Sequence, residues 1–286
     1  SSWSNLLPQH NIPRTCASTV PHTGDNVWVE WETVVNDRRE INRSQKWKMQ
    51  LSRKEVLRHL ADKYEFDQSE WLDDLWPRPF VYKSMPTISL VSRSLEFADV
   101  DRPNYHQVGP FVTNQIHKLS DEDFTKIRRI DTLRKTGKKV IYVSSTTMPG
   151  YPKIAKMQQM LEDTIRSLAT RDNYIFVMRG VDADEHIVSF DFVPQLEVLK
   201  RSDLMISYGG LNSLIEALYY QVPMLVDSAG VNDTSGNIAR IAKINCLAVY
   251  DSERLTQRYL MDKIRNTIND DLIRSNLASH HENIFN

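Results

Sequence analysis

Cysteine, glycine and long hydrophobic runs are all scarce in this sequence. The 286 residues include two cysteines, Cys16 and Cys246, which lie far apart and match no metal-binding spacing. Neither a disulfide framework nor a cysteine metal site is therefore expected, and a reducing, cytoplasmic setting is the simplest one. No apolar run approaches the ~18 residues that a membrane-spanning helix needs. These absences favour a globular protein without a membrane span.

An excess of charge of one sign is also missing. The chain has 36 basic and 37 acidic residues, and its formal net charge is −1. Such a balance creates no strong field for nucleic acid or an anionic membrane. Hydrophobic residues make up 41% and charged residues 26%, which is ordinary for a globular chain with one or two domains. An anionic ligand would therefore need a locally built site.

The nine glycines are unevenly spread, and four of them fall within one stretch, residues 190–240. The hydrophobic pattern there predicts a short helix at 196–200 and a strand at 203–207. Gly209 and Gly210 come next, and they lead into a helix and then a second strand at 222–226. Glycines clustered between a strand and a helix indicate a turn with a specific purpose.

A strand, a glycine pair and a helix start together form an anion site. Glycine lets the backbone approach a ligand closely, and the unpaired N–H groups of the first helical turn attract phosphate. Glu216, one turn into the helix, can accept hydrogen bonds from ribose hydroxyls. Phe192 offers a face to a base, and Asp233 can accept from sugar hydroxyls. The alternative is a plain strand–turn–helix in which the glycines only permit close packing.

The whole string is more specific than the glycine pair alone. It resembles the donor-binding motif of UDP-sugar-dependent glycosyltransferases with the GT-B fold, and in particular the macrolide and natural-product glycosyltransferases. The resemblance implies transfer of a hexose from a UDP-sugar to a hydroxyl of a small hydrophobic acceptor, with inversion and without a metal or other cofactor. The residues that carry it are Phe192, Gln195, Gly209, Gly210, Asn212, Ser213, Glu216, Pro223, Asp233 and Asn237.

The resemblance also implies a role for each donor-site residue. Phe192 would stack on uracil, Gln195 would lie near the base and ribose, and Glu216 would hold the ribose hydroxyls. The diphosphate would lie against the glycine turn and the helix start, at Gly209, Gly210, Asn212 and Ser213. The turn after a predicted strand at 139–144 would also face the phosphates, through Ser145 and Thr147.

Three positions depart from the family pattern. Tyr208 stands where the family usually has a His before the glycine pair, and a tyrosine carries no positive charge at neutral pH. Thr234 follows Asp233 where the family often has Gln, which leaves the identity of the sugar open. Thr146 occupies a position that is usually Gly. These departures leave room for a degenerate relative that binds nucleotide or serves as a non-catalytic partner subunit.

The resemblance predicts an α/β chain of GT-B type. We expect a partial N-terminal α/β domain at residues 1–113, with strands at 15–20, 86–93 and 104–112 and a largely helical stretch at 25–76. A linker and surface helix would follow at 114–138, with a capped helix start. Strands alternating with helices predict a Rossmann-like, doubly wound parallel sheet at 139–270, and a C-terminal helix at 271–286.

The general base of the family is a His in the opening loop of the first domain, and this sequence does not show that segment. We therefore assign no catalytic residue and expect the base upstream of Ser1. His10, His22 and His106 are candidates by residue type only, and a structural or surface role is the better interpretation. The acceptor and the oligomeric state, whether a homo-oligomer or a complex with a partner chain, stay open.

Overall fold

The computed structural model describes residues 16–18, 55, 58–59, 62–65, 86–95, 105–112, 119–144, 152–169, 173–227, 234–251 and 256–285. The chain divides into two compact units, Ser1–Gly109 and Pro110–Asn286, each with its own parallel sheet. This division lies close to the predicted end of the first domain at residue 113. Most of the predicted helical stretch at 25–76 falls outside the described residues.

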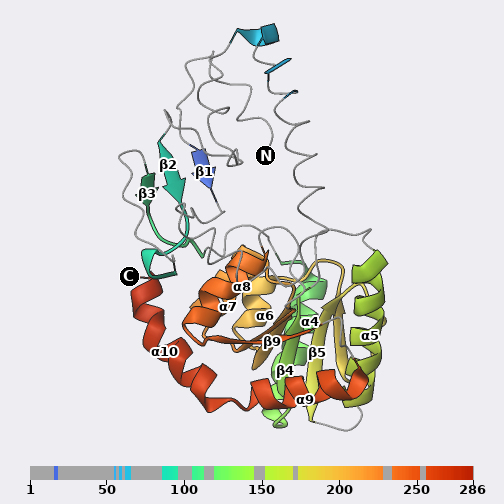
Figure 1. The fold of residues 1–286 in the computed structure, drawn as a ribbon. Coiled ribbons are helices and arrows are strands. Elements are labelled where there is room, and N and C mark those ends of the chain that lie inside the picture. Colours follow the sequence, from blue (N-terminus) through green and yellow to red (C-terminus); the bar gives the residue numbers. More distant parts are fainter. Residues whose placement is uncertain are drawn as a thin grey trace. The chain divides into compact units, whose positions relative to one another are not determined.

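The first unit contains a small parallel sheet of order β1-β2-β3 (Figure 1). Ile88 of β2 pairs with Ala17 of β1 and with His106 of β3. The strands predicted here exist but are shorter than expected, because a 3-10 turn, η3, follows β2 and the Gly109-Pro110 pair follows β3. The bounds are β1 (Cys16–Ser18), β2 (Thr87–Ser89), η3 (Arg93–Leu95) and β3 (Tyr105–Gln107).

The second unit is built on a parallel sheet of order β6-β5-β4-β7-β8-β9. The chain starts at the centre with β4, moves outward through β5 and β6, and then returns to the other side of β4. This is the strand order of a doubly wound, Rossmann-like sheet, as the sequence predicts. The strands are β4 (Lys139–Val143), β5 (Tyr174–Arg179), β6 (Ile187–Phe190), β7 (Leu204–Ser207), β8 (Met224–Asp227) and β9 (Leu247–Tyr250).

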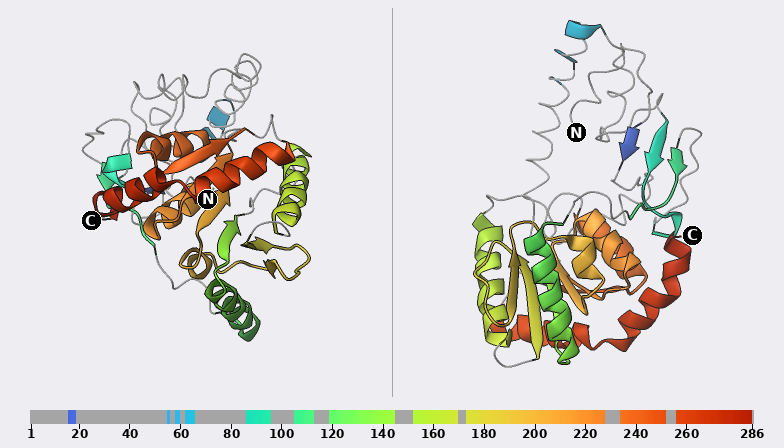
Figure 2. Two further views of the ribbon diagram at one scale, coloured as in Figure 1. Left: turned by 90° about the horizontal axis from the view of Figure 1, so that it is seen from below. Right: turned by 180° about the vertical axis from the view of Figure 1, so that it is seen from behind.

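Helices cover both faces of this sheet (Figures 1 and 2). One face packs against α5 (Pro152–Ala169) and α9 (Gln257–Ile268). The opposite face carries α4 (Asp121–Lys135), α6 (Gln195–Leu199), α7 (Leu211–Tyr219) and α8 (Thr234–Lys243), while α10 (Asp271–Phe285) packs on α7. Side chains alternate along each strand, so Ile141 and Val143 join the α5–α9 core and Tyr142 faces the other layer.

Helix α4 begins at a capping box, as predicted. Ser120 Oγ accepts from the Asp123 amide at 3.1 Å, and Asp123 Oδ2 accepts from the Ser120 amide at 2.9 Å. The bonds that Asp123 Oδ2 accepts, from the Ser120 amide and the Ser120 hydroxyl, lower the pKa of Asp123 below its ordinary value. The helix packs against β4 and β6 and buries Ile127 and Ile130, so it is part of the layered unit rather than a free linker helix.

The connection between β5 and β6 contains no helix. The two strands are parallel, yet only residues 180–186 return the chain along the length of β5. Asp184 organises this return, since its Oδ1 accepts from the amides of His186 and Ile187 at 2.8 and 2.9 Å. Arg166 of α5 pairs with Asp184 Oδ2 at 3.1 Å. Side-chain acceptors therefore hold a connection that contains no crossover helix.

Candidate functional site

The direction of chain progression reverses between β4 and β7. In open sheets of this kind, ligands bind outside the carboxyl ends of the two strands at such a switch point. The two ends are directly joined, because the Ser144 amide donates to the Ile206 carbonyl at 2.9 Å. The turn Tyr208-Gly209-Gly210 follows β7 at this edge, and the predicted phosphate residues Ser145 and Thr147 follow β4 in sequence but lie outside the described residues.

The glycine turn is fixed in shape by its neighbours. Gly209 has φ of +87°, and a Cβ built there would lie 2.9 Å from the side chain of Ile238 and 3.3 Å from Thr234 Cβ. Its amide donates to Ser207 Oγ at 3.2 Å, and its carbonyl accepts from Asn237 Nδ2 at 3.2 Å. Both the backbone conformation and the packing against α8 therefore require glycine at this position.

Helix α7 begins at the second glycine. Gly210 is the N-cap residue, and it supplies no side-chain hydrogen bond to the first turn. Gly210 and Asn212 are exposed, and Ser213 is half-buried. The first N–H groups of the helix thus lack a side-chain cap at the edge where a ligand is expected, and the helix dipole adds positive potential there.

Side chains from three elements meet beside this helix. The Tyr142 hydroxyl of β4 donates to Gln195 Oε1 at 2.7 Å. Gln195 Nε2, at the start of α6, donates to Ser213 Oγ at 3.2 Å and to the carboxylate of Glu216. The structure therefore brings together three of the predicted residues, Gln195, Ser213 and Glu216. It adds Tyr142, which the sequence analysis did not identify.

Burial sets the protonation of this cluster. It raises the pKa of Glu216 above its ordinary value, and the hydrogen bond from Gln195 opposes that rise. Burial also raises the pKa of Tyr142 to about 12; the charge of Glu216 acts in the same direction, and a hydrogen bond with Ser144 opposes it. Tyr142 is thus a neutral donor at physiological pH, and Glu216 is the group in the cluster that can change charge.

Tyr208 lies in a negative environment. Burial raises its pKa to about 12, and the charges of Asp227 and Glu162 act in the same direction. Asp227 ends β8 and is 5% exposed. Tyr208 therefore remains a neutral hydroxyl and brings no positive charge to the switch point. Asp227 was not among the predicted site residues, because the strand was expected to end at residue 226, one residue earlier.

The remaining predicted site residues are Phe192, Asp233 and Thr234. Phe192 follows β6 and is 56% exposed. Thr234 begins α8 and is half-buried beside Gly209. Asp233, the predicted sugar ligand, lies outside the described residues. Their proposed contacts with nucleotide and sugar remain predictions.

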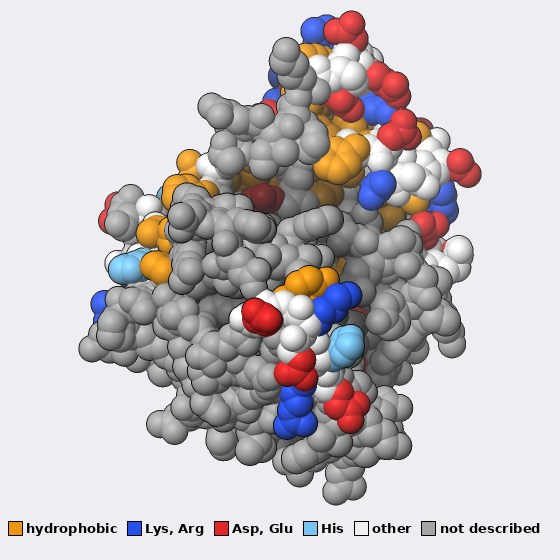
Figure 3. Space-filling view, turned by 90° about the horizontal axis from the view of Figure 1, so that it is seen from above, with side chains coloured by type: hydrophobic (Ala, Val, Ile, Leu, Met, Phe, Trp, Pro, Cys, Tyr) orange, Lys and Arg blue, Asp and Glu red, His pale blue; other side chains and the backbone are white. Residues whose placement is uncertain are grey.

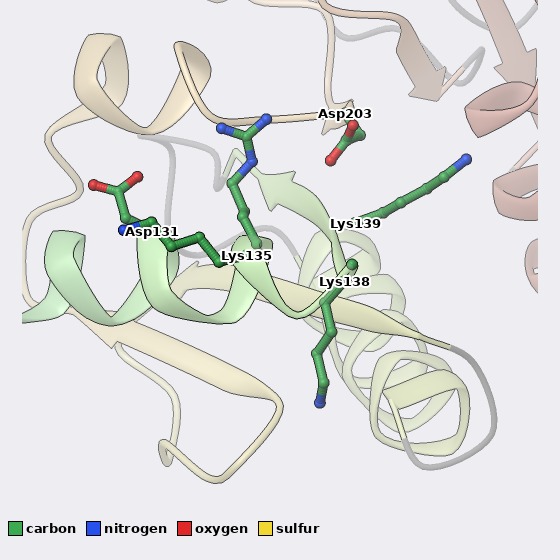
Figure 4. A pocket seen from close by; sticks show the side chains of 7 residues that line it. Asp131, Lys135, Lys138, Lys139 and Asp203 are labelled. Atoms are coloured by element: carbon green, nitrogen blue, oxygen red, sulfur yellow. The ribbon is translucent and has the colours of Figure 1, made fainter.

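The opposite edge of the sheet has a basic pocket of about 550 Å³ (Figure 4). Lys138 Nζ lies 3.2 Å from His186 Nδ1, and Lys139 Nζ donates to Asn269 Oδ1 at 2.8 Å. Figure 4 shows that these two ammonium groups extend in different directions, so they do not converge on one anion. The lining residues are Asp131, Arg134, Lys135, Gly137, Lys138, Lys139 and Asp203.

The charged side chains that Figure 3 shows are of both signs and lie interspersed, with no large patch of one sign among the described residues on that face. Within the described ranges, His, Cys, Asp and Glu nowhere gather in a group of three or more that could hold a metal ion. No helix in this part of the chain is both long and apolar enough to cross a membrane. Local geometry at the switch point is therefore the feature that indicates a ligand.

The sheet order, the glycine turn and the uncapped helix start define a Rossmann-like type of unit. Residues 156–283 match the Glycosyltransferase family 28 C-terminal domain. The predicted resemblance to UDP-sugar-dependent glycosyltransferases of the GT-B fold is confirmed by this match and by the relatives and solved structures that the chain resembles.

Two curated relatives illustrate the similarity. The uncharacterized UDP-glucosyltransferase YojK of Bacillus subtilis is 33% identical over 88 residues, which cover 31% of this chain and 22% of YojK. The putative UDP-glucuronosyltransferase ugt-50 of Caenorhabditis elegans is 25% identical over 193 residues, covering 58% of this chain and 36% of ugt-50. The aligned part is thus well under half of each of these relatives.

The solved structures extend the similarity to nearly the whole chain. The glycotransferase of kitacinnamycin matches 94% of this chain and 65% of its own, with a TM-score of 0.64 and 16% identity. The calicheamicin glycosyltransferase CalG4 matches 94% of this chain and 63% of its own, with a TM-score of 0.62 and 15% identity. At such identities the likeness establishes the GT-B fold.

Proposed function

We propose that this chain supplies the donor half of a glycosyltransferase that binds a UDP-sugar at the carboxyl edge of β4 and β7. The reaction would move a hexose to a hydroxyl of a small hydrophobic acceptor, with inversion and without a metal. The observation that carries the proposal is the glycine turn, which leads into the uncapped start of α7 at the switch point. Glu216 stands one turn further along the same helix.

Each part of the donor has a candidate partner in this arrangement. The amides at the start of α7 would bind the diphosphate, with Ser145 and Thr147 on its other side. Such donors stabilise the negative charge that develops on the departing UDP. In other enzymes a bound metal ion stabilises this charge. Phe192 would stack on the base, and Asp233 and Thr234 would contact the sugar.

The base of the proposed donor nucleotide is a pyrimidine, either uracil or thymine. The names of YojK and ugt-50 specify UDP-sugars. Two solved structures of the same fold, VinC and the spinosyn rhamnosyltransferase SpnG, were determined with thymidine diphosphate. A stacking phenylalanine accepts either pyrimidine, so the choice of UDP rests on the curated relatives.

Calorimetric titration of the 286-residue chain with UDP, thymidine diphosphate and GDP tests the donor site. We expect UDP to bind most tightly and GDP most weakly. Tighter binding of thymidine diphosphate would identify the donor as a dTDP-sugar that binds at the same site. Equal or tighter binding of GDP would refute a site for a pyrimidine nucleotide.

Transfer also needs a base within about 3 Å of the acceptor hydroxyl, and none is assigned. His106 is exposed on β3, and His10 and His22 lie outside the described residues. We expect nucleotide binding without turnover by this chain. Acceptor-dependent release of UDP, assayed with a panel of hydrophobic alcohols and phenols, would contradict this expectation.

A non-catalytic relative is the second candidate. Tyr208 favours it, because a neutral hydroxyl in a negative environment cannot give a diphosphate the positive charge of the family's histidine. A Tyr208→His variant separates the readings. A gain in UDP affinity would show that the turn still accepts the family residue, and no gain would support loss of the donor function.

A further inference from the structure

Gln195 uses both hydrogens of its amide nitrogen inside the cluster. A primary amide has two N–H donors and one carbonyl acceptor. Nε2 donates to Ser213 Oγ and to the Glu216 carboxylate, and Oε1 accepts from the Tyr142 hydroxyl. No hydrogen of the Gln195 amide remains for a base or a ribose, so a direct contact with nucleotide, as the family resemblance implies, would break one of these bonds.

The orientation of this amide follows from its partners. A reversed Gln195 would turn its carbonyl oxygen toward the Glu216 carboxylate, and two acceptors would then face each other. The observed orientation instead gives every atom of the amide a complementary partner. The protonated Tyr142 hydroxyl supplies the donor that the carbonyl end requires.

Tyr142 cannot itself touch a ligand. Its side chain is 3% exposed, within the central strand β4. Glu216 is less deeply buried and lies on the helix whose start faces the switch point. The hydrogen bonds therefore run in one direction, from the sheet interior through Gln195 to a carboxylate at the site.

We propose that Tyr142 is a positioning residue of the donor site: its hydroxyl fixes the Gln195 amide, which holds Glu216 oriented as an acceptor for ribose hydroxyls. This inference rests on the proposed donor function. It assigns Gln195 to Glu216 rather than to the base. One carboxylate oxygen of Glu216 takes the Gln195 hydrogen bond, and the other is left for the ligand.

Tyr142→Phe is the direct test, because it removes the hydroxyl and keeps the ring. The carboxyl carbon of Glu216 is followed by NMR during a pH titration of the ligand-free, 286-residue chain. We expect the pKa of Glu216 to be higher in the variant, because a loosened Gln195 amide no longer opposes the effect of burial. UDP affinity should fall about three- to tenfold, the value of one hydrogen bond.

UDP affinity in the Glu216→Gln background distinguishes a positioning role of Tyr142 from a merely structural one. If Tyr142 acts through the carboxylate, adding Tyr142→Phe to Glu216→Gln should change UDP affinity by less than about twofold. Tyr259→Phe is the matched control. It removes a half-buried hydroxyl that accepts from the Asp251 amide at 3.2 Å and should alter neither readout.

Two results would overturn the inference. One is a Tyr142→Phe chain whose Glu216 pKa and UDP affinity equal those of the unmodified chain. The other is a Tyr142→Phe substitution that lowers UDP affinity by the same factor in the unmodified chain and in the Glu216→Gln background. Failure of the unmodified chain to bind UDP would instead refute the donor function, and the titration of Glu216 would still report on the hydrogen-bond chain, because it needs no nucleotide.

Discussion

The two edges of the six-stranded sheet differ in how their polar groups are arranged. The amino edge holds four cationic side chains around a pocket, yet Lys138 and Lys139 extend apart and bond to His186 and Asn269. The carboxyl edge has no such concentration of charge among its described residues. There, however, a glycine turn, a helix start and a chain of hydrogen bonds from Tyr142 meet at one point.

Polar groups that converge on one point therefore indicate a binding site better than the charge or the volume of a pocket does. Lysines near the end of a helix such as α4 are already accounted for by the helix dipole and by solvation. Oriented backbone amides and a half-buried carboxylate have no comparable structural explanation. Variants at matched positions on the two edges test this difference.

The largest effect is expected when alanine replaces glycine at the two edges. Gly209 (φ +87°) and Gly137 (φ +85°) both occupy the left-handed region, so each Gly→Ala change costs about 1–2 kcal/mol of backbone strain. At Gly209 the new methyl also meets Ile238 at 2.9 Å, which adds about 1–3 kcal/mol of overpacking. At Gly137 the nearest atom is 3.9 Å away.

Urea unfolding and UDP calorimetry measure both costs. Gly209→Ala should lose more stability than Gly137→Ala and should reduce UDP affinity at least tenfold, while Gly137→Ala should leave affinity unchanged. Equal losses of affinity in the two variants would break the comparison, since the amino edge would then matter as much as the switch point.

Removing a carboxylate from each edge should give the next largest effect. Glu216→Ala deletes the proposed ribose acceptor, and its loss should cost about 1–3 kcal/mol of binding, or about 5- to 150-fold in UDP affinity. The melting temperature of the Glu216→Ala variant should barely change. Asp131→Ala deletes a partner of Arg201 on the amino edge and should not alter UDP binding. If Glu216→Ala unfolds the chain instead, Glu216 is structural.

Two glutamates should give opposite pH dependences of stability. Burial raises the folded-state pKa of Glu216 above 4.5, so the stability of the unmodified chain relative to Glu216→Gln should fall as pH rises from about 4.5. The hydrogen bond from Lys200 lowers the pKa of Glu197, with Arg201 acting in the same direction. Its stabilisation relative to Glu197→Gln should be present above about pH 4.5 and lost as pH falls through the lowered pKa. Urea unfolding between pH 3.5 and about 7.5 checks both signs, and slopes of the same sign would contradict the assigned environments.

The smallest effect should come from neutralising the amino edge. The double substitution Lys138→Met and Lys139→Met replaces two half-buried lysines and should change stability by no more than about 0.5 kcal/mol. UDP affinity should stay within about twofold. A tenfold loss of UDP affinity, measured by calorimetry, would show that UDP binding depends on the charges of the amino edge.

Much of the second unit could be predicted because its signals are local. Short buried runs bounded by polar residues identify strands, so the strand predicted at 203–207 agrees with β7 (Leu204–Ser207) to within one residue. The α4 start was also predictable, since Ser120 and Asp123 stand three residues apart and each side chain bonds to the other's backbone amide. The glycine pair between a strand and a helix similarly indicated its own turn.

The parts that were missed depend on contacts between distant segments. Alternation along β4 predicts that Tyr142 faces one side of the sheet, but its acceptor is Gln195, 53 residues later in the chain. The sequence likewise does not reveal that Asp184 and Arg166 can replace a crossover helix between β5 and β6. Packing decides such partners, and periodicity does not encode packing.

The hydrogen bond from Asn237 to the Gly209 carbonyl ties the turn to α8, and it has a consequence for the lifetime of a bound ligand. Asn237 is 1% exposed, so α8 cannot open locally without leaving a buried carbonyl without its donor. Local unfolding of α8 and distortion of the turn are thus one cooperative event. Amide exchange in α8 should therefore slow when nucleotide occupies the turn, and the rate of ligand escape should follow the opening of a helix that follows the turn by more than twenty residues.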